Sequence, residues 1–253
     1  MKKIAFCLYG QPREYLKGYH TNRILKERYP EIGVDYYYHT WIKDNLAGDQ
    51  YYEASEWRNI SSDELKIGQD TIKKINDLYH PVDYSYDEPR NFSQDKLKDS
   101  LCYLNTVNPK KISNINNILS QMYSRNKVRD LLSRNLINNK YDFVISTRFD
   151  YTKELTLNLN EIDISKVYVS DSHHPRKIFP DNFILTGVDN YLDIFNMYNN
   201  LEKIVNNKTL EIRMKENGEN LEFNAEELLF ANFLYYFKNI DNVNYTNAIP
   251  GFP

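Results

Sequence analysis

The sequence alternates between two patterns of apolar residues. Short continuous apolar runs, such as the one from Lys3 to Tyr9, are typical of strands buried in a parallel sheet. Longer segments place apolar residues every three or four positions, which is typical of helices that cover one face of a sheet. Along the chain, the two patterns predict strands at 3–9, 34–39, 82–86, 141–150, 167–170 and 182–187, and helices at 14–28, 61–79, 112–137, 191–205 and 225–237.

Signals at the helix ends support this division. Ser61 stands three residues before Glu64, which fits a capping box at the start of the second helix, and Pro81 stops that helix. Strands that alternate with helices predict a three-layer α/β domain with a mostly parallel central sheet. The sequence has no internal repeat and no obvious linker, so we expect a single domain over residues 1–253.

Composition excludes several classes of protein. The formal net charge is −3, so no basic excess indicates nucleic acid as a partner or attraction to an acidic membrane surface. No apolar segment reaches the roughly 20 residues that span a bilayer, and the apolar run at the N-terminus is shorter than that of a secretory signal. We therefore expect a cytoplasmic protein without a transmembrane segment. The two cysteines, Cys7 and Cys102, suggest neither a disulfide framework nor a zinc site.

The most informative motif closes the predicted strand at 141–150. An apolar run ends there in Arg148-Phe149-Asp150. Ligands of open α/β sheets bind beyond the carboxyl ends of such strands, and alternate residues of an extended chain point the same way. Arg148 and Asp150 can therefore face one site. Asp150 is a hard oxygen ligand suited to Mg²⁺ or Mn²⁺, and Arg148 can pair with phosphate oxygens. A structural ion pair is the alternative.

Two further motifs follow the first and second predicted strands. The turn Gly10-Gln11-Pro12-Arg13 leads into a helix, and such a turn can cradle an anion, with Arg13 on a phosphate. It is neither G-x-G-x-x-G nor a Walker loop. His39-Thr40-Trp41 closes the second strand, where Trp41 could stack on a base or sugar and His39 could be a satisfied core histidine.

Other polar residues are candidates with ordinary alternatives. Tyr123 and Lys127 lie on the long helix, where they could line a pocket or form its solvated side. Glu226 and Glu227 open the last helix; acidic residues are favoured in a first helical turn, but either one could act as a general base. Asp181 is a rival for that role. No G-x-S-x-G motif indicates a Ser-His-Asp triad, and neither cysteine has a recognisable nucleophile context.

The order of these motifs resembles a known family. The chain is similar over about residues 3–235 to the GT-A-type glycosyltransferases of large DNA viruses and of bacterial surface-polysaccharide clusters. The motifs that carry the resemblance are Gly10-Gln11-Pro12-Arg13, His39-Thr40-Trp41, Gln121-x-Tyr123-Ser124-x-x-Lys127 and Thr147-Arg148-Phe149-Asp150.

The resemblance implies a sugar transfer from a UDP- or GDP-sugar to a glycan or other hydroxyl acceptor. It implies a nucleotide-binding part at about 1–150 and an acceptor-side part at about 151–253. Gly10, Gln11, Arg13, His39, Trp41, Tyr123, Lys127 and Arg148 would bind the donor nucleotide, with Glu226, Glu227 or Asp181 as the base. Asp150 would be the metal-binding aspartate of an Asp-x-Asp motif for Mn²⁺ or Mg²⁺. Because Arg148 replaces the first aspartate, it could neutralise the diphosphate directly.

Two alternatives remain open from the sequence. A nucleotidyl- or phosphoryl-transferring enzyme of the same architecture would need more carboxylates around a metal than the motifs supply. A non-catalytic carbohydrate-binding protein would suit the 22 tyrosines, but the long predicted helices do not suit the β-sandwich of most such modules.

Overall fold

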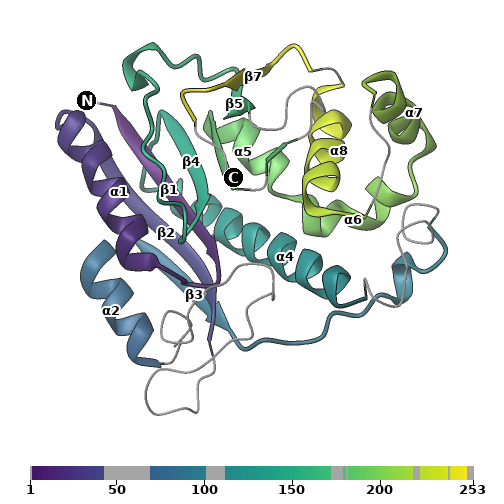
Figure 1. Ribbon diagram of the computed structural model, residues 1–253, viewed down its shortest axis with the longest axis horizontal. Helices are drawn as coiled ribbons and strands as arrows, with labels where there is room; N and C mark the ends of the chain where they lie inside the picture. The colour runs from purple at the N-terminus through teal and green to yellow at the C-terminus, as the bar shows by residue number, and fades with distance from the viewer. Residues whose placement is uncertain are drawn as a thin grey trace.

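The chain folds into a three-layer α/β structure around one sheet (Figure 1). The structure is a computed structural model that describes residues 2–42, 69–100, 112–171, 179–180, 182–218, 223–238 and 240–249. The sheet contains β1 (Lys3–Gly10), β2 (Gly33–Trp41), β3 (Asp83–Asp87), β4 (Phe143–Arg148), β5 (Val167–Ser170), β6 (Phe183–Thr186) and β7 (Val243–Thr246). The helices are α1 (Tyr15–Arg28), α2 (Gln69–Tyr79), α4 (Ile112–Asn135), α5 (Val188–Ile194), α6 (Met197–Val205), α7 (Lys208–Glu216) and α8 (Ala225–Phe237), with short 3₁₀ turns η3 (Asp95–Leu97) and η5 (Leu159–Glu161).

The seven strands lie in the order β3-β2-β1-β4-β6-β5-β7. Their pairings make the sheet parallel throughout except at β6, which runs antiparallel to both of its neighbours. The predicted α/β class and the mostly parallel sheet are therefore confirmed. The sheet draws strands from both sides of residue 150, and the expected division into nucleotide-binding and acceptor-side parts stays a prediction.

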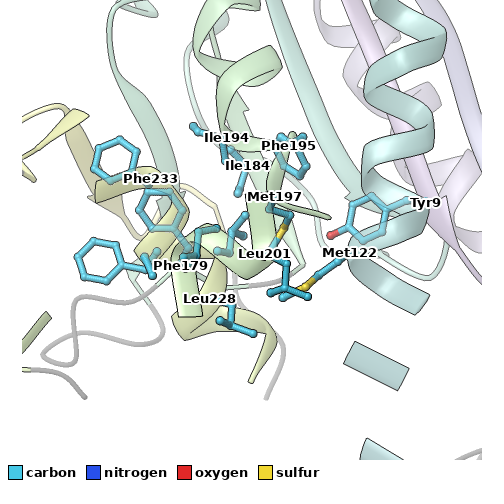
Figure 2. Close-up of a cluster of buried hydrophobic side chains, with 14 of the residues drawn as sticks. Tyr9, Met122, Phe179, Ile184, Ile194, Phe195, Met197, Leu201, Leu228 and Phe233 are labelled. Atoms are coloured by element: carbon cyan, nitrogen blue, oxygen red, sulfur yellow. The ribbon is translucent and has the colours of Figure 1, made fainter. Parts of the chain in front are cut away.

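Each face of the sheet carries its own core. Alternate side chains of β1 point to opposite faces, so Phe6 and Leu8 pack with α1 and α2, whereas Cys7 and Tyr9 pack with the helices on the other side. Figure 1 shows α1 and α2 on one face and α4, α5, α6 and α8 on the other. Figure 2 shows part of this second core, where Tyr9 of β1 and Met122 of α4 lie among side chains from α5, α6 and α8. The two cores hold the parallel strands in the middle layer.

The predicted helix at 191–205 is wrong in one respect, because it is two helices, α5 and α6. The amide of Asn232 on α8 donates hydrogen bonds to the carbonyl oxygens of Ile194, at 2.6 Å, and Asp193, at 3.3 Å. It thereby satisfies carbonyl groups that a helix end leaves without partners. These bonds come from a distant helix, so the local pattern could not show them.

Other boundaries differ modestly from the prediction. The predicted capping box at Ser61 and Glu64 lies outside the described residues, within which α2 starts at Gln69. Helix α7 and strand β7 were not predicted. None of the helices in the described ranges is long and apolar enough to cross a membrane.

Parallel strands bring their carboxyl ends to the same edge of the sheet. β1, β2, β3 and β4 end there at Gly10, Trp41, Asp87 and Arg148. The antiparallel β6 begins at this edge, because Phe183 pairs with Thr147. We call this the carboxyl edge; the candidate chemistry gathers there.

Candidate active site

Two arginines meet one carboxylate at the carboxyl edge. Arg148 donates from Nε to Oδ1 of Asp150 at 2.9 Å and from Nη2 to Oδ2 at 2.7 Å. Arg13, from the turn after β1, places its Nη2 atom 3.4 Å from Oδ2 of the same carboxylate. Asp150 is only 4% exposed. The structure thus brings together three residues that the sequence predicted from two separate motifs.

Glycine allows α1 to approach the turn that carries Asp150. A Cβ atom at Gly18 would lie 2.1 Å from the carbonyl oxygen of Phe149, so any side chain there would force the two segments apart. Phe149 itself is buried against Tyr38 and Tyr79 on the α1–α2 face. Packing on the α1–α2 face therefore fixes the backbone between Arg148 and Asp150.

The turn after β1 is fixed at Gly10. This residue has φ +91°, a conformation that glycine adopts without the steric penalty of other residues. Its N–H donates to the hydroxyl of Ser124 at 2.9 Å, and its carbonyl oxygen accepts from the hydroxyl of Thr40 at 2.8 Å. Both backbone groups are thus held by side chains from α4 and β2, which fixes the path that leads to Gln11 and Arg13. Gln11 is half-buried in this turn.

His39 links three elements beneath the same edge. Its Nδ1 atom lies 2.7 Å from the Ser124 hydroxyl oxygen, and its Nε2 atom lies 3.2 Å from Oδ2 of Asp87. Tyr123 also donates to Oδ2 of Asp87, at 2.8 Å. Because a carboxylate can only accept, Nε2 carries the proton and Nδ1 accepts from Ser124. His39 is therefore a satisfied, buried histidine, as one of the two sequence interpretations expected.

Burial and hydrogen bonding shift the pKa values of this network. Burial lowers the pKa of His39 below its ordinary value, although the bond to Asp87 opposes the shift. The hydrogen bond from His39 and the one from Tyr123 together lower the pKa of Asp87 to about 2, against partial burial. At neutral pH the pair is therefore a neutral imidazole and an ionised carboxylate.

The order Ser124, His39, Asp87 has the connectivity of a hydrolase triad, which no sequence motif indicated. The geometry does not suit a nucleophile. Ser124 is completely buried, and its oxygen already accepts from the N–H of Gly10. Cys7, the cysteine within the described ranges, is no better, since burial raises the pKa of its thiol to about 12. The Ser124 network fixes the turn at Gly10.

An aromatic cluster covers this network. Trp41 is buried, with its ring centre 5.1 Å from that of His39 and 5.6 Å from that of Tyr123. Arg90 and Lys127 place their charged groups 4.3 and 5.1 Å from the centre of the Tyr123 ring. Sequence reasoning missed Arg90 and Asp87, which lie outside the predicted strands and helices. Asp87 gave one signal, because it directly follows a predicted strand, as Asp150 follows β4.

Helix α8 carries the candidate bases Glu226 and Glu227 in its first turn. Asn224 accepts from the backbone N–H of Glu227 at 2.8 Å and so caps the helix. Glu227 is 1% exposed and Glu226 is half-buried. Phe179 precedes β6 in the chain, and its ring packs on Phe230 and Phe233 of α8. This contact joins α8 to the segment before β6, the strand that begins at the carboxyl edge. Asp181, the rival for the role of base, lies outside the described residues.

A divalent cation does not fit the described side chains at Asp150. Within the described ranges, no group of three His, Cys, Asp or Glu side chains could hold a metal ion. Both oxygens of Asp150 accept from Arg148, and Arg13 adds a second positive charge. An added cation would have to displace one guanidinium and face the other. Two guanidiniums therefore already place positive charge at this carboxylate.

Comparison with known proteins adds a loose structural likeness. No family model and no curated protein sequence matches this chain. Among solved structures it resembles the galactosyltransferase LgtC, determined in complex with donor and acceptor sugar analogues. That match has 10% sequence identity and a TM-score of 0.39, and it covers 96% of this chain and 73% of the other.

Proposed function

We propose that the protein is a glycosyltransferase that moves a sugar from a nucleoside diphosphate donor to a hydroxyl group of a glycan or other acceptor. The observation that supports this function is the arrangement of Arg13 and Arg148 around the buried Asp150. It stands at the carboxyl edge of the sheet, where open α/β proteins bind their ligands. Paired guanidiniums suit the two phosphates of such a donor.

Asp150 acts in this proposal as a positioning residue for the arginines. A guanidinium carries five N–H donors, so it can hold a carboxylate on one edge and a phosphate on another. The two bonds from Arg148 to Asp150 fix the plane of the guanidinium before a donor arrives. Fixed positive charge stabilises the leaving nucleoside diphosphate more than mobile charge does, because no reorganisation is needed during the reaction.

The start of α1 provides a second contact for the diphosphate. The N-cap residue Glu14 makes no capping hydrogen bond with its side chain. The first N–H groups of a helix point outward and favour an anion. The turn from Gly10 to Arg13 would then hold the phosphates between the helix start and Arg148, with Gln11 beside them. His39, Trp41, Tyr123 and Lys127 lie on the β2–β3 side of this turn, where the rest of the nucleotide would extend.

We place the general base on the first turn of α8. The acceptor oxygen attacks the anomeric carbon, the bond from that carbon to the diphosphate oxygen breaks, and the acceptor proton passes to a carboxylate. Glu226 and Glu227 are the candidates there, with Asp181 as the rival. Replacing the base by glutamine should lower kcat strongly and leave donor affinity intact, whereas replacing the other glutamate should not.

A screen of nucleotide sugars by thermal shift, followed by transfer assays, tests the function. Binding to the folded state raises the unfolding temperature, so the correct donor should stabilise the protein and then be consumed. Nucleoside triphosphates in the same screen address the nucleotidyl- or phosphoryl-transfer alternative. Free sugars address the carbohydrate-binding alternative. Stabilisation by triphosphates alone or by free sugars alone would exclude the proposal.

A further inference from the structure

Arg90 and Lys127 approach the same aromatic ring from different elements. Arg90 follows β3 and stacks its guanidinium 4.3 Å from the ring centre of Tyr123 and 5.0 Å from that of Phe92. Lys127 lies one turn after Tyr123 on α4, with its Nζ atom 5.1 Å from the same ring centre. The hydrogen bond from Tyr123 to Asp87 fixes the ring in place. Both cations are thus held against one ring that is itself fixed.

Neither cation forms a salt bridge with a carboxylate in the described part of the chain. Other arginines there do: Arg134 bonds Asp83 through two contacts of 2.7 and 2.8 Å, and Arg148 bonds Asp150. The carboxylate of Asp87 accepts from His39 and Tyr123, and the charge of Lys127 helps to lower its pKa, but Asp87 makes no salt bridge with either cation. Two positive charges on one ring both attract an anion that binds beside it.

The two cations stand apart from the Arg13–Arg148 pair. Arg90 and Lys127 flank the end of β3, whereas Arg148 ends β4, and the order β3-β2-β1-β4 separates these strands. Three strand spacings separate β3 from β4, which is roughly 14 Å, and two separate β3 from β1, the strand before Arg13, which is roughly 10 Å. One phosphate group cannot bridge either separation.

We propose that Arg90 and Lys127 form a second phosphate-binding site, which takes a substrate phosphate other than the one held by Arg148. A guanidinium can bind two phosphate oxygens in its plane, and an ammonium adds a point charge from another side. This inference extends the proposed function, and its phosphate has two possible sources. It belongs either to the nucleotide of the donor or to a phosphorylated acceptor.

Calorimetric titration with inorganic phosphate tests the site without relying on sugar transfer. The test protein is Arg148→Gln, in which the diphosphate site is weakened. Adding Arg90→Gln and Lys127→Gln should weaken phosphate binding about tenfold or more, since one charge-assisted hydrogen bond contributes about 1.5–3 kcal/mol. Adding Lys203→Gln and Lys208→Gln, two exposed lysines of α6 and α7, removes the same charge and should change the affinity little. Thermal unfolding checks that all variants fold.

The source of the phosphate follows from two further titrations with Arg148 restored. Weaker binding of UDP or GDP in the Arg90→Gln/Lys127→Gln protein assigns the site to the donor. Unchanged UDP and GDP binding with weaker binding of a sugar phosphate assigns it to the acceptor. If the Arg90/Lys127 variant and the Lys203/Lys208 variant bind inorganic phosphate with equal affinity, the second site is overturned. Suppose that no nucleotide sugar binds or reacts, but that removing Arg90 and Lys127 still weakens the binding of inorganic phosphate. This result would overturn only the proposed function.

Discussion

Arg148 and Asp150 bind each other through two parallel hydrogen bonds, of 2.9 and 2.7 Å, at the end of β4. Only Phe149 separates them in sequence, and Asp150 lies in the turn after β4, where the N–H of Tyr151 donates to the carbonyl oxygen of Arg148 at 3.2 Å. The pair is therefore a local product of the strand end. Its position at the carboxyl edge, with Arg13 alongside, makes it the centre of the proposed donor site.

The first prediction concerns the geometry of this pair. Arg148→Lys keeps the charge but cannot reproduce two parallel bonds, and Asp150→Asn removes the charge that orients both arginines. We expect each change to lower kcat/KM for the donor by about a hundredfold or more, in line with the loss of a preorganised charge contact. Steady-state kinetics with a saturating acceptor measures this.

The matched control for that experiment is Asp83→Asn. Arg134 binds Asp83 in the same two-bond manner at the start of β3, away from the carboxyl edge. This change should lower stability modestly and leave activity close to wild type. An Asp150→Asn enzyme as active as Asp83→Asn would rule out the role given to Asp150.

The second prediction concerns metal ions. Because two guanidiniums occupy Asp150, we expect sugar transfer to continue after chelation with EDTA. We also expect Mn²⁺ alone to leave the unfolding temperature unchanged, since a specific ligand would raise it. Activity that disappears with EDTA and returns with Mn²⁺ would instead support the metal role that the sequence resemblance assigns to Asp150.

The third prediction concerns the contact between α1 and the Asp150 turn. Gly18→Ala would place a Cβ atom 2.1 Å from the carbonyl oxygen of Phe149, so one segment must move. We expect a loss of about 1–3 kcal/mol in unfolding free energy, as for other overpacked sites, together with weaker donor binding. Denaturant unfolding and donor titration measure the two effects.

Gly33→Ala serves as the control. Its added Cβ would meet the flexible side chain of Lys3 at 3.3 Å, so the change should be tolerated. If the Gly18 and Gly33 variants are equally stable, α1 does not pack closely against the turn that carries Asp150.

The fourth prediction concerns pH. Burial lowers the pKa of His39 in the folded state, so the unfolded chain takes up a proton first as the pH falls below about 6.5. Stability should therefore decline as the pH falls through this range, by up to about 1.4 kcal/mol per pH unit. Asp87 acts at lower pH, where its contribution is lost between its ordinary value and about 2. Unfolding temperatures measured from pH 7 to 5 should fall less steeply in His39→Gln than in wild type.

The exposed His20→Gln is the control for the loss of a histidine. If His39→Gln and wild type lose stability with the same slope, His39 is not held neutral by the fold.

Much of the fold follows from local patterns. Strand β5 and helix α8 have the predicted bounds, because apolar runs and helical spacing are properties of neighbouring residues. At the break between α5 and α6, the carbonyl oxygen of Ile194 accepts from Asn232, which is distant in sequence, and β7 pairs with β5. Such elements are set by tertiary contacts that no local window contains.

The site shows the same division. The sequence predicted that Arg148 and Asp150 face one site, but it placed Asp150 in the strand, whereas Asp150 lies in the turn after β4. The turn at Gly10 was also predicted. The role of Ser124 could not be predicted in the same way, because its bonds to His39 and Gly10 join three separate elements. Arg90 became visible only when the fold placed it on Tyr123.

The most direct measurement is a crystal structure of the protein with a nucleoside diphosphate or its sugar. The account predicts that the diphosphate lies within hydrogen-bonding distance of Arg148 and Arg13, next to Asp150 and the start of α1. The account would be contradicted if the diphosphate bound elsewhere, if the Arg13–Asp150–Arg148 cluster were unchanged, and if solvent separated the cluster from the diphosphate.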